Sequence, residues 1–306
     1  MEFPKEGNPA IAMSKMNRIV LSIPMVFILV LIMAELPLLL QPDGSHSIRL
    51  DWPQGAASIK AYFSGIPTGD SFRFLSGQNT LSFWEQIGSY FIISFGYLAC
   101  GALIGTTIGV LIGIYFSLSR AEWLKRTVEF LGAMPDFVSI LLLQFLVVFV
   151  ASKTGVVLFQ IATLSVKEPA IVLPLVSSIL IPASYMIRNV TMQMTYTLAE
   201  DYIGFAKARG LRKLYIVFYH ALPNVLPFIR ADLHKFLGIL IGNIFIVEYL
   251  YNLHGLTMLL FSNVYSYSGY QFPLVVNGLL TLLLLYAVIY TLLKTYLWGW
   301  EKVLSR

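Results

Sequence analysis

Few residues in this sequence could do chemistry, and their spacing excludes most catalytic arrangements. The four histidines show no metal-ligand spacing, and no His-Glu-x-x-His motif occurs: His46, His220, His234 and His254. The chain also lacks a Gly-x-x-x-x-Gly-Lys-Ser/Thr phosphate loop and a plausible nucleophile–base pair. The single cysteine, Cys100, cannot form an internal disulfide. We therefore predict that the chain is not an enzyme and binds no metal or other cofactor itself.

Two acidic residues within apolar runs are candidates for a transport pathway or gate. Ionisable side chains are costly inside a membrane, so Glu248 and Asp136 are functional candidates by default. Asp136 follows Pro135, however, and an acid there also suits the start of a helix. Glu248 is equally consistent with a packing hydrogen bond. Asp232 and Lys235, spaced i, i+3, can form an ion pair.

The composition shows that lipid is the solvent for most of this chain. Of 306 residues, 57% are apolar and 12% are charged, and mean hydropathy is +0.74; an average soluble domain has about 25% charged residues. A bilayer core about 30 Å thick needs roughly 20 apolar helical residues. Runs near that length lie at residues 19–40, 87–118, 130–151, 170–187, 236–251 and 274–293. We predict an all-α, polytopic membrane protein with about six transmembrane helices, the first retained and not a cleaved signal peptide.

The basic residues predict the orientation of these helices. The net charge is +5, but the basic residues are dispersed between apolar runs, so a nucleic-acid partner is not expected. With the N-terminus inside, fifteen lysines and arginines lie in inner segments and five in outer segments. Both termini are therefore predicted to be cytoplasmic. Residues 1–86 hold the N-terminal tail, the first span and an outer loop from 41, which is either a small cap or irregular; residues 87–306 hold five spans and an inner loop at 188–230.

Four glycines repeat every fourth residue along the second apolar run: Gly101, Gly105, Gly109 and Gly113. This spacing places them on one helix face, where the absence of side chains lets another helix approach closely. The pattern predicts helix packing. It leaves open whether the partner helix belongs to this chain or to a second subunit.

The inner loop specifies local structure in detail. Thr197 and Glu200 fit a capping box, and Gly210 stands where a left-handed residue ends a helix. Leu198, Tyr202, Phe205 and Ala206 share a face at helical spacing, and a second apolar stretch follows at Leu211, Leu214, Tyr215 and Phe218. Two short helices around Gly210 are predicted. They could rest on lipid headgroups or dock a soluble partner.

A known family shares this pattern. The loop reads Glu200-Asp-Tyr-Ile-Gly-Phe-Ala-Lys-Ala-Arg-Gly-Leu211, followed by His220-Ala-Leu-Pro-Asn224. It resembles the coupling loop of ABC importer permeases, and most nearly the oligopeptide/dipeptide/nickel branch. Ala206, Gly210, Leu222 and Pro223 occupy the places of the general Glu-Ala-Ala, three residues, Gly, nine residues, Ile-x-Leu-Pro signature. Gly204, Phe205 and His220 depart from it.

Two further segments extend the resemblance over about residues 87–293. Met134-Pro-Asp-Phe137 resembles the family's Pro-Ser-Phe, with aspartate in place of serine. Val247-Glu248 with His254-Gly255-Leu256 resembles its Val-Glu…Pro-Gly-Leu/Ile-Gly segment, with histidine where proline is usual. The N-terminal helix and outer loop look more like the B-type than the C-type member of the permease pair.

The resemblance implies a type I ABC importer permease fold in a bacterial or archaeal cell membrane. The implied partners are two ABC ATPase subunits that bind ATP and Mg²⁺, a second permease in a heterodimer, and an extracytoplasmic substrate-binding protein. The implied cargo is an oligopeptide or dipeptide, and the alternative cargo is a nickel or other metal chelate or another small solute. A different class, a secondary transporter without ATPase partners, is the competing hypothesis. The residues implied to contact the ATPase are Glu200, Asp201, Tyr202, Phe205, Ala206, Ala208, Gly210, Leu211, His220, Leu222 and Pro223.

Overall fold

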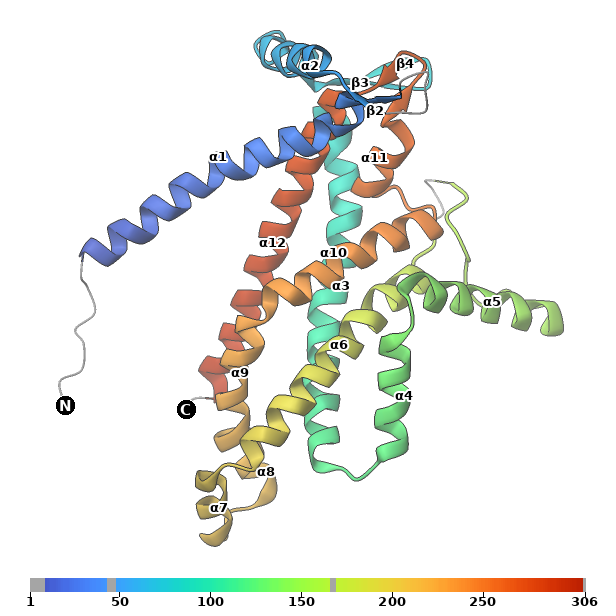
Figure 1. Ribbon diagram of the computed structural model, residues 1–306. Helices are drawn as coiled ribbons and strands as arrows, with labels where there is room; N and C mark the ends of the chain where they lie inside the picture. Colours follow the sequence, from blue (N-terminus) through green and yellow to red (C-terminus); the bar gives the residue numbers. More distant parts are fainter. Residues whose placement is uncertain (1–8, 43–47, 166–168, 305–306) are drawn as a thin grey trace. The chain divides into compact units, whose positions relative to one another are not determined.

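The computed structural model of the chain describes residues 9–42, 48–165 and 169–304 (Figure 1). The predicted N-terminal tail before residue 9 and His46 lie outside these ranges. The chain forms two compact units, one made of residues 1–87 with 260–282 and the other of 88–259 with 283–306.

Helices account for most of the described residues. They are α1 (Pro9–Leu39), α2 (Trp52–Gly65), α3 (Phe83–Leu118), α4 (Glu122–Ala133), α5 (Asp136–Thr154), α6 (Val172–Leu198), α7 (Asp201–Ala208), α8 (Lys213–Tyr215), α9 (Leu222–Ala231), α10 (Leu233–Leu250), α11 (Leu256–Asn263) and α12 (Phe272–Leu304). A 3-10 turn, η1 (Asp70–Phe72), and a π-helical turn, η2 (Ile216–Ala221), complete them. Three short antiparallel hairpins are β1–β2 (Leu40–Pro42, Ile48–Leu50), β3–β4 (Arg73–Ser76, Asn79–Ser82) and β5–β6 (Tyr265–Ser266, Gly269–Tyr270).

Six of the described helices are long and apolar enough to span a bilayer: α1, α3, α5, α6, α10 and α12. The predicted all-α, six-span architecture is confirmed. The third apolar run was placed too early, because Pro135 divides it. Met134 is extended, with ψ of 141°, as the residue before a proline prefers, so α4 ends at Ala133 and α5 begins at Asp136. Within the expected inner loop, α6 continues to Leu198, since no glycine or proline follows Pro182 to end it.

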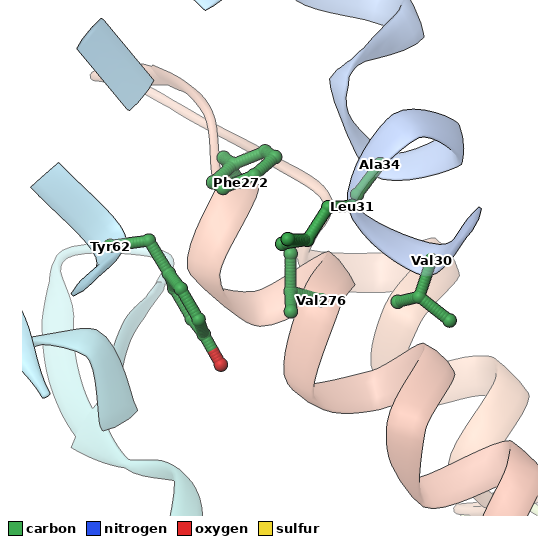
Figure 2. Packing of buried hydrophobic residues seen from close by; sticks show 6 residues of the cluster. All are labelled: Val30, Leu31, Ala34, Tyr62, Phe272 and Val276. Carbon is green, nitrogen blue, oxygen red and sulfur yellow. The ribbon is translucent and has the colours of Figure 1, made fainter. Parts of the chain in front are cut away.

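In the first unit, residues 48–86 are folded into helices and short strands and do not form an irregular loop. Its helix α2 packs on α1 and on the start of α12 through a buried cluster, in which Tyr62 meets the ring of Phe272 edge-on at 6.0 Å (Figure 2). The other members are Val30, Leu31, Ala34 and Val276. Alternate large and small apolar side chains from three helices give this unit its own core.

Polar contacts fix the same unit. The Tyr62 hydroxyl donates to Asn277 Oδ1 at 2.8 Å, and Asn277 Nδ2 donates to the Ser71 carbonyl at 2.7 Å. The Gln271 side chain pairs with both backbone groups of Leu75, at 2.6 and 2.8 Å, as a neighbouring strand would. Because buried polar groups cost free energy unless they are paired, these bonds hold the α2–β4 segment in one place. Its predicted location outside the cell stays a prediction.

In the second unit the glycine face of α3 lies against α6 of the same chain. A Cβ added at Gly101 would lie 2.5 Å from the Ser178 carbonyl oxygen, and one at Gly109 would lie 2.4 Å from Met186 Cβ. At Gly113 the nearest atom would be Val190 Cβ at 2.7 Å. Gly105 is less crowded, with its nearest neighbours at 3.5 Å. The closest helix to this stripe is therefore within the chain.

The contact at Gly101 has a further cause in α6. Pro182 has no amide hydrogen, so the carbonyl of Ser178, four residues earlier, lacks its usual helical donor. That carbonyl points at Gly101, where only a residue without a side chain leaves room for it. The proline of one helix and the glycine of the other are thus two parts of one contact.

We expect Gly101→Ala to destabilise the protein by about 1–3 kcal/mol, because the new methyl group meets backbone that cannot move alone. Gly96→Ala in the same helix is the matched control, since an added Cβ there meets nothing within 4 Å. Alanine favours a helix over glycine by up to about 1 kcal/mol. Thermal unfolding in detergent measures both, and equal melting temperatures for the two variants would contradict the packing described here.

Candidate functional site

The connection between α6 and α9, residues 199–221, folds into a short helical hairpin at the ends of both helices (Figure 1). The predicted pair of short helices around Gly210 is confirmed in outline. The predicted capping box is wrong, because Thr197 lies in the last turn of α6 and the N-cap of α7 is Glu200. Asp201 occupies the first turn of α7 and Lys207 the last, so both charges favour the helix dipole.

Gly210 ends α7 in the left-handed conformation, with φ of 76°. Its amide donates to the Lys207 carbonyl at 3.0 Å, and the Leu211 amide donates to the Ala206 carbonyl at 3.3 Å. These two bonds form a Schellman motif, which satisfies carbonyls that the helix end would leave free. A side chain with a Cβ is strained at this φ, so glycine is required for the turn.

The second half of the connection contains a π-helical turn, η2, directly before α9. Pro223 lies at the start of α9 and cannot donate a backbone hydrogen bond. A wider turn before a proline avoids the clash between its ring and the carbonyl four residues earlier. The His220-Ala-Leu-Pro sequence therefore sets the angle at which the connection enters α9. Asn224 Nδ2 then donates to the Tyr202 hydroxyl at 3.0 Å and ties α7 to α9.

One side of the connection is buried within the chain, through Ile203, Ala206, Ile216, Val217 and Ala221. The opposite side exposes large apolar residues, which we call the exposed aromatic surface: Tyr202, Phe205, Leu214, Tyr215 and Tyr219. Phe205 is the extreme case, at 72% exposed. The predicted common face is thus divided, since Ala206 faces inward while Tyr202 and Phe205 face outward.

The other residues predicted for this site are distributed between the two sides. Leu222 is buried and Leu211, His220 and Pro223 are half-buried; the exposed group comprises Glu200, Asp201, Ala208 and Gly210. The connection leads into α9, whose Arg230 forms an ion pair with Glu301 of α12 at 3.1 Å. The exposed aromatic surface is therefore linked to α12 in two steps. Buried contacts join the connection to its own chain, and the Arg230–Glu301 ion pair joins α9 to α12.

Glu248, near the end of α10, is fully buried, and its carboxylate binds the start of α11. Oε2 accepts from the Thr257 amide at 2.8 Å, the Met258 amide at 3.3 Å and the Thr257 hydroxyl. Oε1 accepts from the Ser94 hydroxyl at 2.5 Å, and Ser94 Oγ in turn accepts from the Leu256 amide at 2.7 Å. Free amides at a helix start favour a negative charge. The carboxylate thus acts as a cap for α11, which is the packing role that the sequence left open. A pathway role stays a prediction.

The same carboxylate explains Gly255. A Cβ added there would lie 2.1 Å from the Glu248 carboxyl group. The glutamate and the glycine, seven residues apart in the sequence, therefore belong to one contact, and the Val-Glu…Gly-Leu pattern describes a helix cap.

Asp136 begins α5 and lines a cavity of about 360 Å³ together with Lys125, Glu129, Tyr185 and Arg188. A neighbouring cavity of about 500 Å³ shares Tyr185, Arg188 and Met192 and extends to α10, where Lys235 lines it. The structure thus brings one predicted pathway residue, Asp136, to a cavity, while Glu248 lines neither of these two.

Between the two cavities, Tyr185 of α6 donates to Asp232 Oδ2 at the start of α10, and Asn189 Nδ2 donates to the same oxygen at 2.9 Å. The expected Asp232–Lys235 pair is wrong. Lys235 instead lies over the Tyr185 ring, with Nζ 5.5 Å from its centroid. The sequence analysis did not predict this cluster around Tyr185. The available signal was Arg188, because α6 continues past the predicted apolar run at 170–187 and so includes this charged residue.

The chain matches the family model described as binding-protein-dependent transport system inner membrane component over residues 105–297, more than half of its length. That range includes the α6–α9 connection and Glu248. The chain belongs to this family. Its members are transport permease components and not enzymes, and with six apolar helices the chain is a multi-pass cell membrane protein.

Relatives lie in the oligopeptide/dipeptide group of ABC importer permeases, as the resemblance predicted. The chain is 22% identical over 213 residues to the metal-staphylopine import system permease protein CntB of Staphylococcus aureus, covering 68% of this chain and 65% of the relative. It is 27% identical over 180 residues to a putative peptide permease protein of Brucella suis, covering 55% of each. The glutathione transport system permease protein GsiC of Salmonella choleraesuis is 25% identical over 212 residues, with 66% and 65% covered. The match thus spans less than two thirds of these relatives' own length.

Glu248→Ala should destabilise the protein by about 1–3 kcal/mol, because it leaves the buried Thr257 amide and the half-buried Met258 amide unpaired. Hydrogen exchange at these two amides should accelerate more than exchange elsewhere in the chain. Glu122→Ala, which removes an exposed i, i+3 pair with Lys125, is the control and should change stability by less than about 1 kcal/mol. Unchanged exchange at Thr257 and Met258 in the Glu248 variant would contradict the capping role.

Proposed function

We propose that this chain is a permease subunit of an ATP-driven importer and that the α6–α9 connection receives the ATPase subunit. The observation that carries the proposal is the exposed aromatic surface on a connection whose backbone is fixed by the Gly210 turn and the π-helical turn before Pro223. Exposed apolar side chains on a rigid element are typical of a protein interface. The family membership of the chain supports a docking role over a lipid-resting one.

In this proposal the connection transmits movement rather than performing a reaction. ATP and Mg²⁺ bind to the ATPase subunits, and their closure displaces the connection. Because the inner side of the connection is buried against its own chain and Arg230 pairs with Glu301, α9 and α12 would move with it. A partner shifts such an equilibrium only by binding the two states differently.

The remaining partners follow from the same proposal. Two ATPase subunits, a second permease in a heterodimer and an external binding protein would complete the transporter, with this chain as the B-type permease. Both termini and the α6–α9 connection would lie in the cytoplasm, as the excess of basic residues predicts.

For the cargo we propose oligopeptides or dipeptides. The names of the relatives refer to peptides, glutathione and a metal chelate, so a metal chelate is the second candidate. A secondary transporter without ATPase partners is the alternative class, in which the exposed aromatic surface would rest on lipid headgroups.

Gly210→Val should abolish ATP-dependent uptake, because valine resists the left-handed conformation that the turn needs. Gly210→Asn should retain much of the uptake, because asparagine tolerates that conformation better than other residues. Gly204→Val, in the same short helix with nothing within 4 Å of an added Cβ, is the matched control. Uptake into cells and ATPase activity of the purified complex measure the effect. Equal uptake by the Gly210→Val and Gly210→Asn variants would contradict the role of the turn.

Phe205→Asp should weaken co-purification with the ATPase subunit at least about tenfold without unfolding the permease, because the side chain is exposed in the chain alone and would be buried in the interface. Trp123→Asp, at another exposed aromatic residue outside the connection, should retain the ATPase. Recovery of the wild-type chain without any ATPase subunit, together with uptake in cells that lack that subunit, would contradict the importer proposal.

A further inference from the structure

Two cationic side chains, Arg188 and Lys235, lie near the Tyr185 ring and line the same cavity. Arg188 Cζ is 6.0 Å and Lys235 Nζ is 5.5 Å from the ring centroid. Both residues are exposed, and neither forms an ion pair with any residue that the structure describes. A lysine or arginine that served only to set topology would be free to extend into water or toward lipid headgroups. Here both lie within about 6 Å of the same aromatic ring.

The wall itself is held rigid. Tyr185 and Asn189 both donate to Asp232 Oδ2, which joins α6 to the start of α10. The negative charge of Asp232 is therefore engaged by two neutral donors and not by the cations. Because a binding group is most effective when it is already positioned, this network prepares Arg188 and Lys235 to accept an anionic group.

The cavity has the size and lining of a small-molecule site. Its volume is about 500 Å³, within the range of about 300–1,000 Å³ usual for such sites. Besides the two cations, its lining includes the carboxylate of Asp232, the amide side chains of Asn189 and Gln193, and the apolar side chains of Met192 and Phe228. The adjoining cavity of about 360 Å³ shares Tyr185 and Arg188 and adds Asp136.

We propose that Arg188 and Lys235 bind a carboxylate of the transported solute as it passes through this cavity. The guanidinium offers paired donors that match the geometry of a carboxylate, and the ammonium adds a second charge. Amide and apolar groups beside them suit a peptide-like solute with amide bonds and side chains, in preference to a bare inorganic ion. This inference rests on the proposed importer function and names the chemical group that the permease itself recognises.

The test is equilibrium binding to the permease, purified with whatever subunits accompany it, in phosphatidylcholine nanodiscs. The probes are a panel of Ala-X-Ala tripeptides, each as the free acid and as the C-terminal amide, with binding followed by saturation-transfer NMR. We expect the free acids to bind at least about tenfold more tightly than the amides, because the amide removes the charge that the cations recognise. Added salt should weaken the binding of the acids more than that of the amides.

Arg188→Gln and Lys235→Gln should each weaken binding of the free acids about tenfold and leave the amides unchanged. Asp232→Asn should tighten binding of the acids, because it removes the nearby negative charge while an amide oxygen can still accept from Tyr185. Arg126→Gln, an exposed arginine that lines neither cavity, is the matched control.

Three results would overturn the proposal: no free acid in the panel binds, acids and amides bind equally, or both glutamine variants bind the acids as the wild type does. The binding is also measured in nanodiscs of anionic phosphatidylglycerol. If the acids no longer bind there and the lipid is retained through Arg188 and Lys235, the cavity is a lipid headgroup site, and the proposal is likewise overturned. Binding is measured without ATP, so failure here leaves the effects of Gly210→Val and Phe205→Asp on uptake and ATPase retention intact. Failure of those tests would instead remove the importer function.

Discussion

The close approach of α6 to α3 is the contact on which the rest of the second unit depends. Lipid provides little hydrophobic force between helices, so packing contacts have to hold them together. The glycines of α3 supply that contact by letting the backbone of α6, opened at Ser178 by Pro182, reach the surface of α3. With one side of α6 fixed in this way, its other sides are available to α10 and α9.

The consequences extend along α6 in both directions. At its middle, Tyr185 and Asn189 hold Asp232 and so fix the start of α10, beside the cavities that Arg188 lines. At its end, α6 carries the connection that turns at Gly210 and returns into α9. A displacement of the connection would thus reach the cavity wall through a single continuous helix. The proposed coupling site directly follows α6, and Arg188 of the proposed carboxylate site lies on α6.

Charged groups within the apolar helices have different roles, which their neighbours decide. Glu248 is fully buried and its oxygens accept from the Ser94 hydroxyl of α3 and from donors at the start of α11, so it stabilises structure. Arg188 and Lys235 have no ion-pair partner in the described part of the chain and face a cavity. A charged residue that is buried and hydrogen-bonded, such as Glu248, has a structural role. A charged residue that is exposed and has no ion-pair partner in the described part of the chain, such as Arg188, is available to a solute.

The amino-acid sequence by itself determined the six spans, the family and the turn at Gly210, because hydropathy and a left-handed glycine are local properties that no distant contact alters. The sequence analysis misplaced the start of α5, because Pro135 interrupts the apolar run. It also misplaced the N-cap of α7, because α6 continues through Thr197. Only the tertiary structure decided that Glu248 caps α11, that the glycine stripe meets α6, and that Arg188 and Lys235 both lie near the Tyr185 ring beside a cavity. Each of these joins residues from different helices, and spacing along one helix carries no information about which other helix lies against it.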